Sequence, residues 1–160
     1  MPELNATLAR VLASRFEANL VRVGELGSPL SEKEFWAKPY PYGNSFGHLV
    51  LHLTGNLNYY IGAQIANIGY VRDRDREFTE PNPLSKEEAL KRLGAAVGMA
   101  IETVRAQSGA DWSKAYSAVN TNCGNRLDMV LQCAAHMQHH IGQMIYLCRE
   151  WQRQPRATKP

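Results

Sequence analysis

The chain has 160 residues, of which 44% are hydrophobic and 21% are charged, and its formal net charge is +3. This length allows one domain with a substantial core, but not two ordinary domains. No uncharged apolar run reaches the roughly 18 residues of a membrane span, and residues 1–20 lack the apolar centre of a signal peptide. We therefore expect a cytoplasmic protein with no membrane partner.

Two further partner classes are disfavoured by composition. The basic residues form no stripe with interleaved aromatics, which argues against nucleic-acid binding. The cysteines are odd in number and form no Cys-x-x-Cys pair, so we expect reduced thiols rather than disulfides or a structural zinc knot. They are Cys123, Cys133 and Cys148.

The first half of the chain predicts two long helices. In residues 4–26, apolar side chains recur at three- and four-residue spacing, at Leu8, Val11, Leu12, Phe16 and Leu20. A short helical turn is expected next, because Ser31 and Glu34 fit a capping box. Prolines and a glycine then predict an irregular stretch, and the second long helix is expected over residues 45–67.

A long polar connection follows, with a charged segment at residues 72–77 and two prolines, and we expect it to pack on the rest of the protein. The third helix is predicted over residues 85–109, because Ser85 and Glu88 form another capping box before an apolar helical period. After a loop at residues 110–124, the fourth helix is predicted over residues 125–151.

No segment has the period-two alternation of a strand, so the predicted fold is an all-α four-helix bundle. We expect one such domain over residues 1–153 and a basic tail over residues 154–160. The long second connection leaves room for a crossover between parallel neighbouring helices.

All five histidines fall into two windows, His48 with His52 and His136 with His139 and His140. Each window holds one pair spaced i,i+4, which places two imidazoles on one helix face. Helical phase directs His136 and His140 toward the bundle interior and His139 nearer the outside. If the two helices pack together, three or four imidazoles converge, as in a divalent metal site.

The residues near the histidines narrow the chemistry. No Glu or Asp lies within one turn of either window, which argues against a carboxylate-bridged di-iron site. A bis-histidine haem fits an i,i+4 pair beside Gln143 less well. Three neutral imidazoles and an open position suit Zn²⁺, Ni²⁺ or Fe²⁺. The alternative for each single histidine is a hydrogen-bonded residue at the edge of the core.

Residues 44–56 read NSFGHLVLHLTGN, and residues 136–143 read HMQHHIGQ. These two segments resemble the second-helix and fourth-helix motifs of the DinB-like (YfiT-type) metalloenzyme family. Residues 72–78 are similar to one subgroup of unknown function. The resemblance covers most of the chain and implies an up-down-down-up bundle that forms a homodimer.

The same resemblance implies that a divalent ion is held by His52, His136 and His140. It leaves His48, Asn56 and Gln143 as residues that line the site or contact a small-molecule substrate, with His48 as an alternative ligand. His139 is interpreted as a residue at the boundary of the core or at a dimer face. No catalytic side chain is identified.

Three functions follow as hypotheses. The family includes thiol-dependent S-transferases, so one hypothesis is activation of a low-molecular-weight thiol for transfer to a small electrophile. The implied ion is Ni²⁺ or Zn²⁺, with Fe²⁺ or Mn²⁺ as alternatives. A second hypothesis is hydrolysis by a water that the ion activates. A third is a dimeric metal-binding or stress-response module without catalysis. The sequence does not separate the three.

Overall fold

The computed structural model describes residues 2–80 and 83–154, so Pro81 and nearly all of the predicted basic tail lie outside the described residues. No strand is found in the described part of the chain. Within it, no helix is both long and apolar enough to cross a membrane. The elements in chain order are α1 (Pro2–Gly27), α2 (Glu32–Trp36), α3 (Phe46–Leu57), η1 (Asn58–Ala66), α4 (Arg76–Thr79), α5 (Lys86–Ala106), α6 (Gly109–Trp112) and α7 (Arg126–Arg153).

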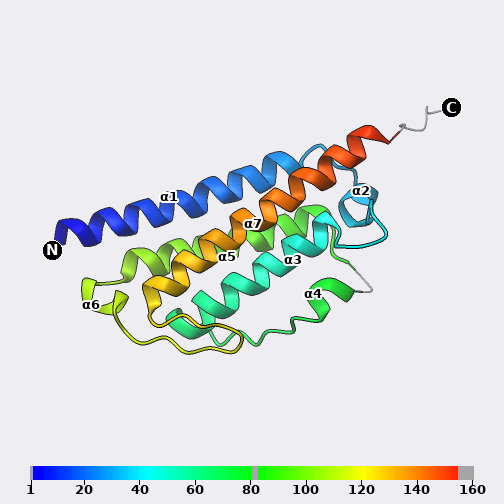
Figure 1. The fold of residues 1–160 in the computed structure, drawn as a ribbon. Helices are drawn as coiled ribbons and strands as arrows, with labels where there is room; N and C mark the ends of the chain where they lie inside the picture. Colours follow the sequence, from blue (N-terminus) through cyan, green and yellow to red (C-terminus); the bar gives the residue numbers. More distant parts are fainter. Residues whose placement is uncertain (1, 81–82, 155–160) are drawn as a thin grey trace.

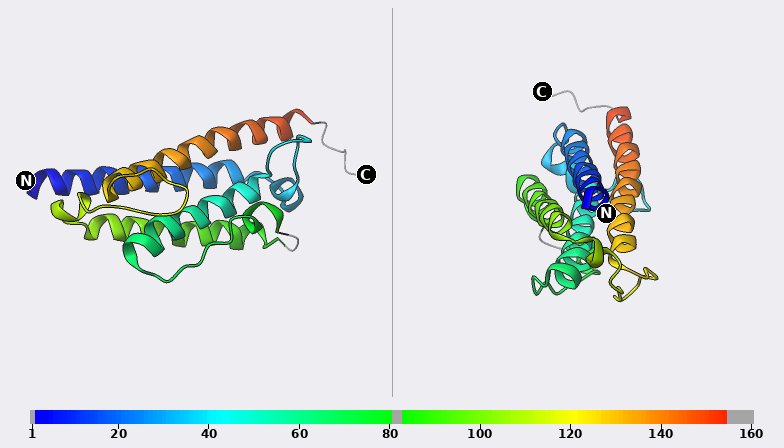
Figure 2. Two further views of the ribbon diagram at one scale, coloured as in Figure 1. Left: turned by 60° about the horizontal axis from the view of Figure 1, so that its bottom comes forward. Right: turned by 90° about the vertical axis from the view of Figure 1, so that its left-hand side faces the viewer.

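The four long helices lie side by side in an up-down-down-up bundle (Figure 1). α1 and α7 run in one direction, whereas α3 and α5 run in the other, as the two further views also show (Figure 2). The segment between the parallel helices α3 and α5 therefore crosses the length of the bundle. α3 packs against both α5 and α7, and α1 packs against the same two helices. The predicted four-helix bundle and its topology are confirmed.

Side-chain caps set where the long helices begin. The hydroxyl of Ser45 accepts a hydrogen bond from the His48 backbone N–H at the start of α3, and Ser85 does the same for Glu88 at the start of α5. Asn125 caps α7 through the Asp128 N–H. These three helices begin within one residue of their predicted positions.

The core is formed where apolar faces of the four long helices meet. Its largest fully buried side chains include Phe16, Phe46, Leu53, Ile61, Met137 and Met144. One expectation for α1 was wrong: Val11 is 47% exposed, although its neighbour Leu12 is buried. Adjacent helical positions lie about 100° apart, so Val11 falls outside the face that α5 and α7 cover.

Two segments differ from the predicted elements. The second long helix changes after Leu57 into the π-helix η1, and it ends at Asn67 in a left-handed conformation with φ 56°. The sequence does not reveal this change, because the apolar pattern of α3 continues through η1. The third helix ends at Ala106, and the short helix α6 occupies the first part of the predicted loop at residues 110–124.

Candidate metal centre

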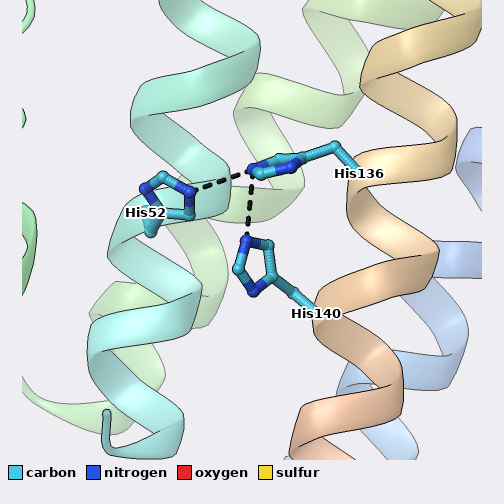
Figure 3. A group of neighbouring side chains, drawn as sticks. All are labelled: His52, His136 and His140. Carbon is cyan, nitrogen blue, oxygen red and sulfur yellow. Dashed lines mark hydrogen bonds between the residues drawn. The ribbon is translucent and has the colours of Figure 1, made fainter. Parts of the chain in front are cut away.

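Three histidines from two helices meet in the bundle interior (Figure 3). His52 projects from α3, and His136 and His140 project from α7. The Nε2 atom of His136 lies 2.9 Å from Nε2 of His52 and 3.2 Å from Nε2 of His140. One nitrogen from each ring lies within 4.8 Å of the others. The i,i+4 spacing on α7 and the contact between α3 and α7 together create this convergence.

The nitrogen spacing suits a small divalent ion. With metal–nitrogen distances of about 2.0–2.1 Å, two ligands of a tetrahedral ion lie about 3.3 Å apart. The His136 to His140 distance of 3.2 Å is close to that spacing, and the His52 to His136 distance of 2.9 Å needs only a slight outward movement of one ring. The three imidazoles therefore fit a site for one divalent ion.

His52 is oriented by a buried ion pair from the crossover. Its Nδ1–H donates to Oε2 of Glu77 at 2.8 Å. Arg72 binds both oxygens of the same carboxylate, with its Nε 2.7 Å from Oε1 and its Nη2 2.9 Å from Oε2. Because a carboxylate only accepts, Nδ1 of His52 carries a proton, and Nε2 of the same ring faces the other histidines.

Gly55 makes room for this carboxylate. A Cβ atom at Gly55 would lie 1.9 Å from Oε1 of Glu77, which is far inside van der Waals contact. Glu77 is 6% exposed and lies at the start of the short helix α4, so its charge is compensated by Arg72 rather than by water. The glycine inside α3 is thus required by the approach of the crossover.

His140 is oriented by a residue of its own helix. Its Nδ1–H donates to Oε1 of Gln143 at 2.7 Å, which leaves its Nε2 directed at His136. The Nε2 of Gln143 lies 3.3 Å from Nε2 of His139, whose ring is exposed and stands 5.1 Å from the His140 ring. His139 therefore lies outside the group of three, beside its edge.

Burial sets the charge state of the two α7 histidines. Loss of solvent, with the neighbouring histidines adding to it, lowers the pKa of His136 to about 3. Loss of solvent also lowers the pKa of His140 to about 4, although its bond to Gln143 acts in the opposite direction. Both rings are neutral near pH 7, which is the form that binds metal ions.

The other two predicted residues of the second long helix, His48 and Asn56, lie in different surroundings. His48 lies apart from the group of three: its Nδ1 is 2.8 Å from the Ser45 hydroxyl, and its ring packs edge-on against Trp36. Asn56 lies one turn after His52 on α3 and is buried. It lines a small cavity together with His136.

Glu77 was missed as a site residue, although its segment was noted for its charge. No carboxylate is near the histidine windows in the sequence, as we noted. In the fold, however, Glu77 contacts His52, although the two are 25 residues apart. It bonds to Nδ1 and does not join the three convergent nitrogens. A glycine inside the predicted helix, at Gly55, was the signal that another part of the chain approaches there.

These features define a class of protein, namely a four-helix bundle with a three-histidine group in its interior that suits a divalent ion. The chain belongs to the DinB superfamily, whose family model matches residues 15–144. It is similar in fold to a solved structure described as the conserved protein of locus from Enterococcus faecalis, with a TM-score of 0.73 and 16% identity over 88% of this chain and 95% of that chain. None of the curated proteins matches the chain. The predicted family is confirmed.

Proposed function

We propose that this protein is a metal-dependent S-transferase, which activates a low-molecular-weight thiol for attack on a small electrophile. The observation that carries the proposal is the convergence of three imidazoles, from His52, His136 and His140, with no carboxylate among them. A divalent ion held there, Ni²⁺ or Zn²⁺ ahead of Fe²⁺ or Mn²⁺, would lower the pKa of a thiol or water in its open position.

The protein's own thiols are poorly suited to be the nucleophile. All three cysteines are buried. Burial raises the pKa of Cys133, and it raises the pKa of Cys148 to about 11. A thiolate is the reactive form, so Cys133 and Cys148 are unreactive near pH 7. The nucleophile in the proposed reaction therefore comes from outside the protein.

The state of Glu77 favours a thiol over water as that nucleophile. Both oxygens of Glu77 are engaged by Arg72 and His52, so this carboxylate is not available as a general base. A free thiol has a pKa of about 8.5, compared with about 15.7 for water. A thiol thus needs much less help to lose its proton, and Lewis acidity alone is sufficient.

The proposed reaction is a substitution without net oxidation. The thiol releases its proton to solvent, and the sulfur uses its electron pair to form a bond to the electrophilic carbon. The bond to the leaving group breaks, and that group departs with the bonding electrons. The role of the chain is to hold the three imidazoles in place, through Glu77 at His52 and Gln143 at His140.

The test compares thiol and hydrolytic substrates. Protein loaded with Ni²⁺ or Zn²⁺ is assayed with glutathione, cysteine or coenzyme A and 1-chloro-2,4-dinitrobenzene, and separately with a panel of esters and amides. We expect turnover that needs both the ion and a thiol, is lost in His136→Ala and persists in His139→Ala. Ester or amide turnover without a thiol would favour hydrolysis, and no turnover in either panel would favour a binding module.

A further inference from the structure

A small cavity lies against the three-histidine group. It has a volume of about 120 Å³, and its lining includes Asn56, Tyr60, Thr121, Gln132, Cys133 and His136. Asn56 and Tyr60 come from the second long helix, and the last three come from α7. Thr121 belongs to the loop before α7. The cavity therefore lies between the helices that supply the histidines, and His136 is common to both features.

The loop is fastened over this cavity by hydrogen bonds at both sides. The Tyr116 hydroxyl donates to the Tyr60 backbone carbonyl at 2.8 Å, and the Tyr60 hydroxyl donates to the Val119 carbonyl at 3.0 Å. The Thr121 hydroxyl donates to Oε1 of Gln132 at 3.2 Å. The hydroxyls of Tyr60 and Thr121 and the Oε1 atom of Gln132 therefore already have hydrogen-bond partners within the protein.

Asn56 differs from these lining residues. This residue is 6% exposed, and its Oδ1 atom is buried with no hydrogen-bond partner among the described residues. A buried acceptor without a partner disfavours folding, so such an atom is expected to meet a ligand. Asn56 follows His52 by one helical turn, which puts its amide on the same face of α3. The unused acceptor therefore belongs to the cavity beside the histidines.

The size and charge of the cavity define what it can hold. Since a water occupies about 30 Å³ of liquid, the cavity has room for a group of about four non-hydrogen atoms. None of the described residues that line the cavity is an aspartate, glutamate, lysine or arginine. A charged group would lose its hydration there without a counter-charge.

We propose that this cavity is a substrate subsite of the metal centre and that it binds a small neutral group with an N–H or O–H donor, of the size of a primary carboxamide. The donor hydrogen-bonds to Oδ1 of Asn56. The assignment rests on the proposed function for the neighbouring ion, and it makes Asn56 a residue that determines specificity. Substrates or thiols that carry such a group close to the reacting atom are the ones expected to bind.

The test uses acetamide and acetone, which have the same number of non-hydrogen atoms but differ in the N–H donor. Saturation-transfer NMR on their methyl protons measures binding to the protein whether or not an ion is present. Paramagnetic relaxation of the same protons in Co²⁺-loaded protein, with Zn²⁺-loaded protein as the diamagnetic reference, measures nearness to the ion. We expect acetamide to bind about tenfold more tightly than acetone.

The variant Asn56→Leu should remove this preference, and the smaller Asn56→Ala should do the same if leucine is not accommodated. Thr54→Val is the matched control, because Thr54 lies on the same helix but lines a separate groove between α3, α5 and the crossover. We expect the unfolding midpoint of Asn56→Leu to be unchanged or raised. A lowered midpoint together with an unchanged preference for acetamide would mean that Asn56 is structural and would overturn the proposal.

The two proposals fail in different ways. Equal binding of acetamide and acetone to the native protein would overturn the subsite, whatever the metal content. A preference for acetamide by saturation transfer in protein that retains no Co²⁺ would support the cavity and contradict the metal centre. Relaxation of acetamide by Co²⁺ that is lost in Asn56→Leu, at unchanged cobalt content, supports both.

Discussion

The carboxylate of Glu77 accepts a hydrogen bond from Nδ1 of His52 at 2.8 Å, although His52 belongs to α3 and Glu77 lies 25 residues later in the crossover between α3 and α5. Arg72 holds both oxygens of that carboxylate, and all three side chains are less than a tenth exposed. The crossover is therefore part of the site, since it sets the ring orientation of one candidate ligand.

Replacing Glu77 by glutamine is expected to weaken the binding of Ni²⁺ or Zn²⁺ by about 10- to 100-fold, because the negative charge that strengthens His52 as a ligand is lost. The change also leaves the Arg72 charge buried without its partner, which should lower the free energy of unfolding by about 3 kcal/mol. Competition with a chromophoric chelator measures the first effect, and urea unfolding the second.

The double variant Arg72→Met/Glu77→Gln separates the two roles. It should regain part of the lost stability, because no unpaired charge remains buried, while the metal affinity stays low. If Glu77→Gln bound the metal ion as tightly as the native protein does, the ion pair would serve only to attach the crossover to α3.

Gly55→Ala is expected to weaken metal binding and lower stability, because its Cβ would lie 1.9 Å from Oε1 of Glu77 and would displace the carboxylate. Gly98→Ala in α5 is the matched control. No atom lies within 4 Å of the Cβ position there, so the change should stabilise the protein by about 0.5–1 kcal/mol. Thermal unfolding and chelator competition on both variants make the comparison, and an unaffected metal affinity in Gly55→Ala would contradict the role of the carboxylate.

The metal-free protein should lose stability as the pH falls below about 6.5. The pKa of His136 is lowered to about 3 and that of His140 to about 4 in the folded state, from an ordinary value of 6.5. Between these values the unfolded chain binds more protons than the folded one, so the free energy of unfolding rises with pH in that window and levels off above it. Urea unfolding followed by circular dichroism, in the presence of a chelator, measures the dependence.

The double variant His136→Asn/His140→Asn provides the control for that pH dependence. Without the two depressed groups, its stability should change less between pH 6.5 and pH 4 than that of the native protein. The same slope in both proteins would show that other groups cause the pH dependence.

Much of the fold could be predicted from the sequence because its determinants are local. Ser45, Ser85 and Asn125 cap helices at positions that the sequence displays, and the length of the second connection left room for the crossover. The π-helix η1 could not be predicted, since its residues continue the apolar pattern of α3. The homodimer and the cytoplasmic location stay predictions.

The convergence of His52, His136 and His140 was predictable because two i,i+4 patterns and a family motif point to it. The residues that orient these histidines were not equally predictable. Gln143 follows His140 by three residues and was noted, whereas Glu77 comes from a loop in which several acidic and basic residues alternate. Which of these is buried depends on the path of the crossover, and that path is set by tertiary packing.

The most direct test of the metal centre is the metal content of purified protein and of five single alanine variants, measured by mass spectrometry after dialysis against Ni²⁺ or Zn²⁺. The native protein, His48→Ala and His139→Ala should retain about one ion per chain, while His52→Ala, His136→Ala and His140→Ala should lose it. Full occupancy in His136→Ala and His140→Ala, or loss of the ion in His48→Ala alone, would contradict the three-histidine site.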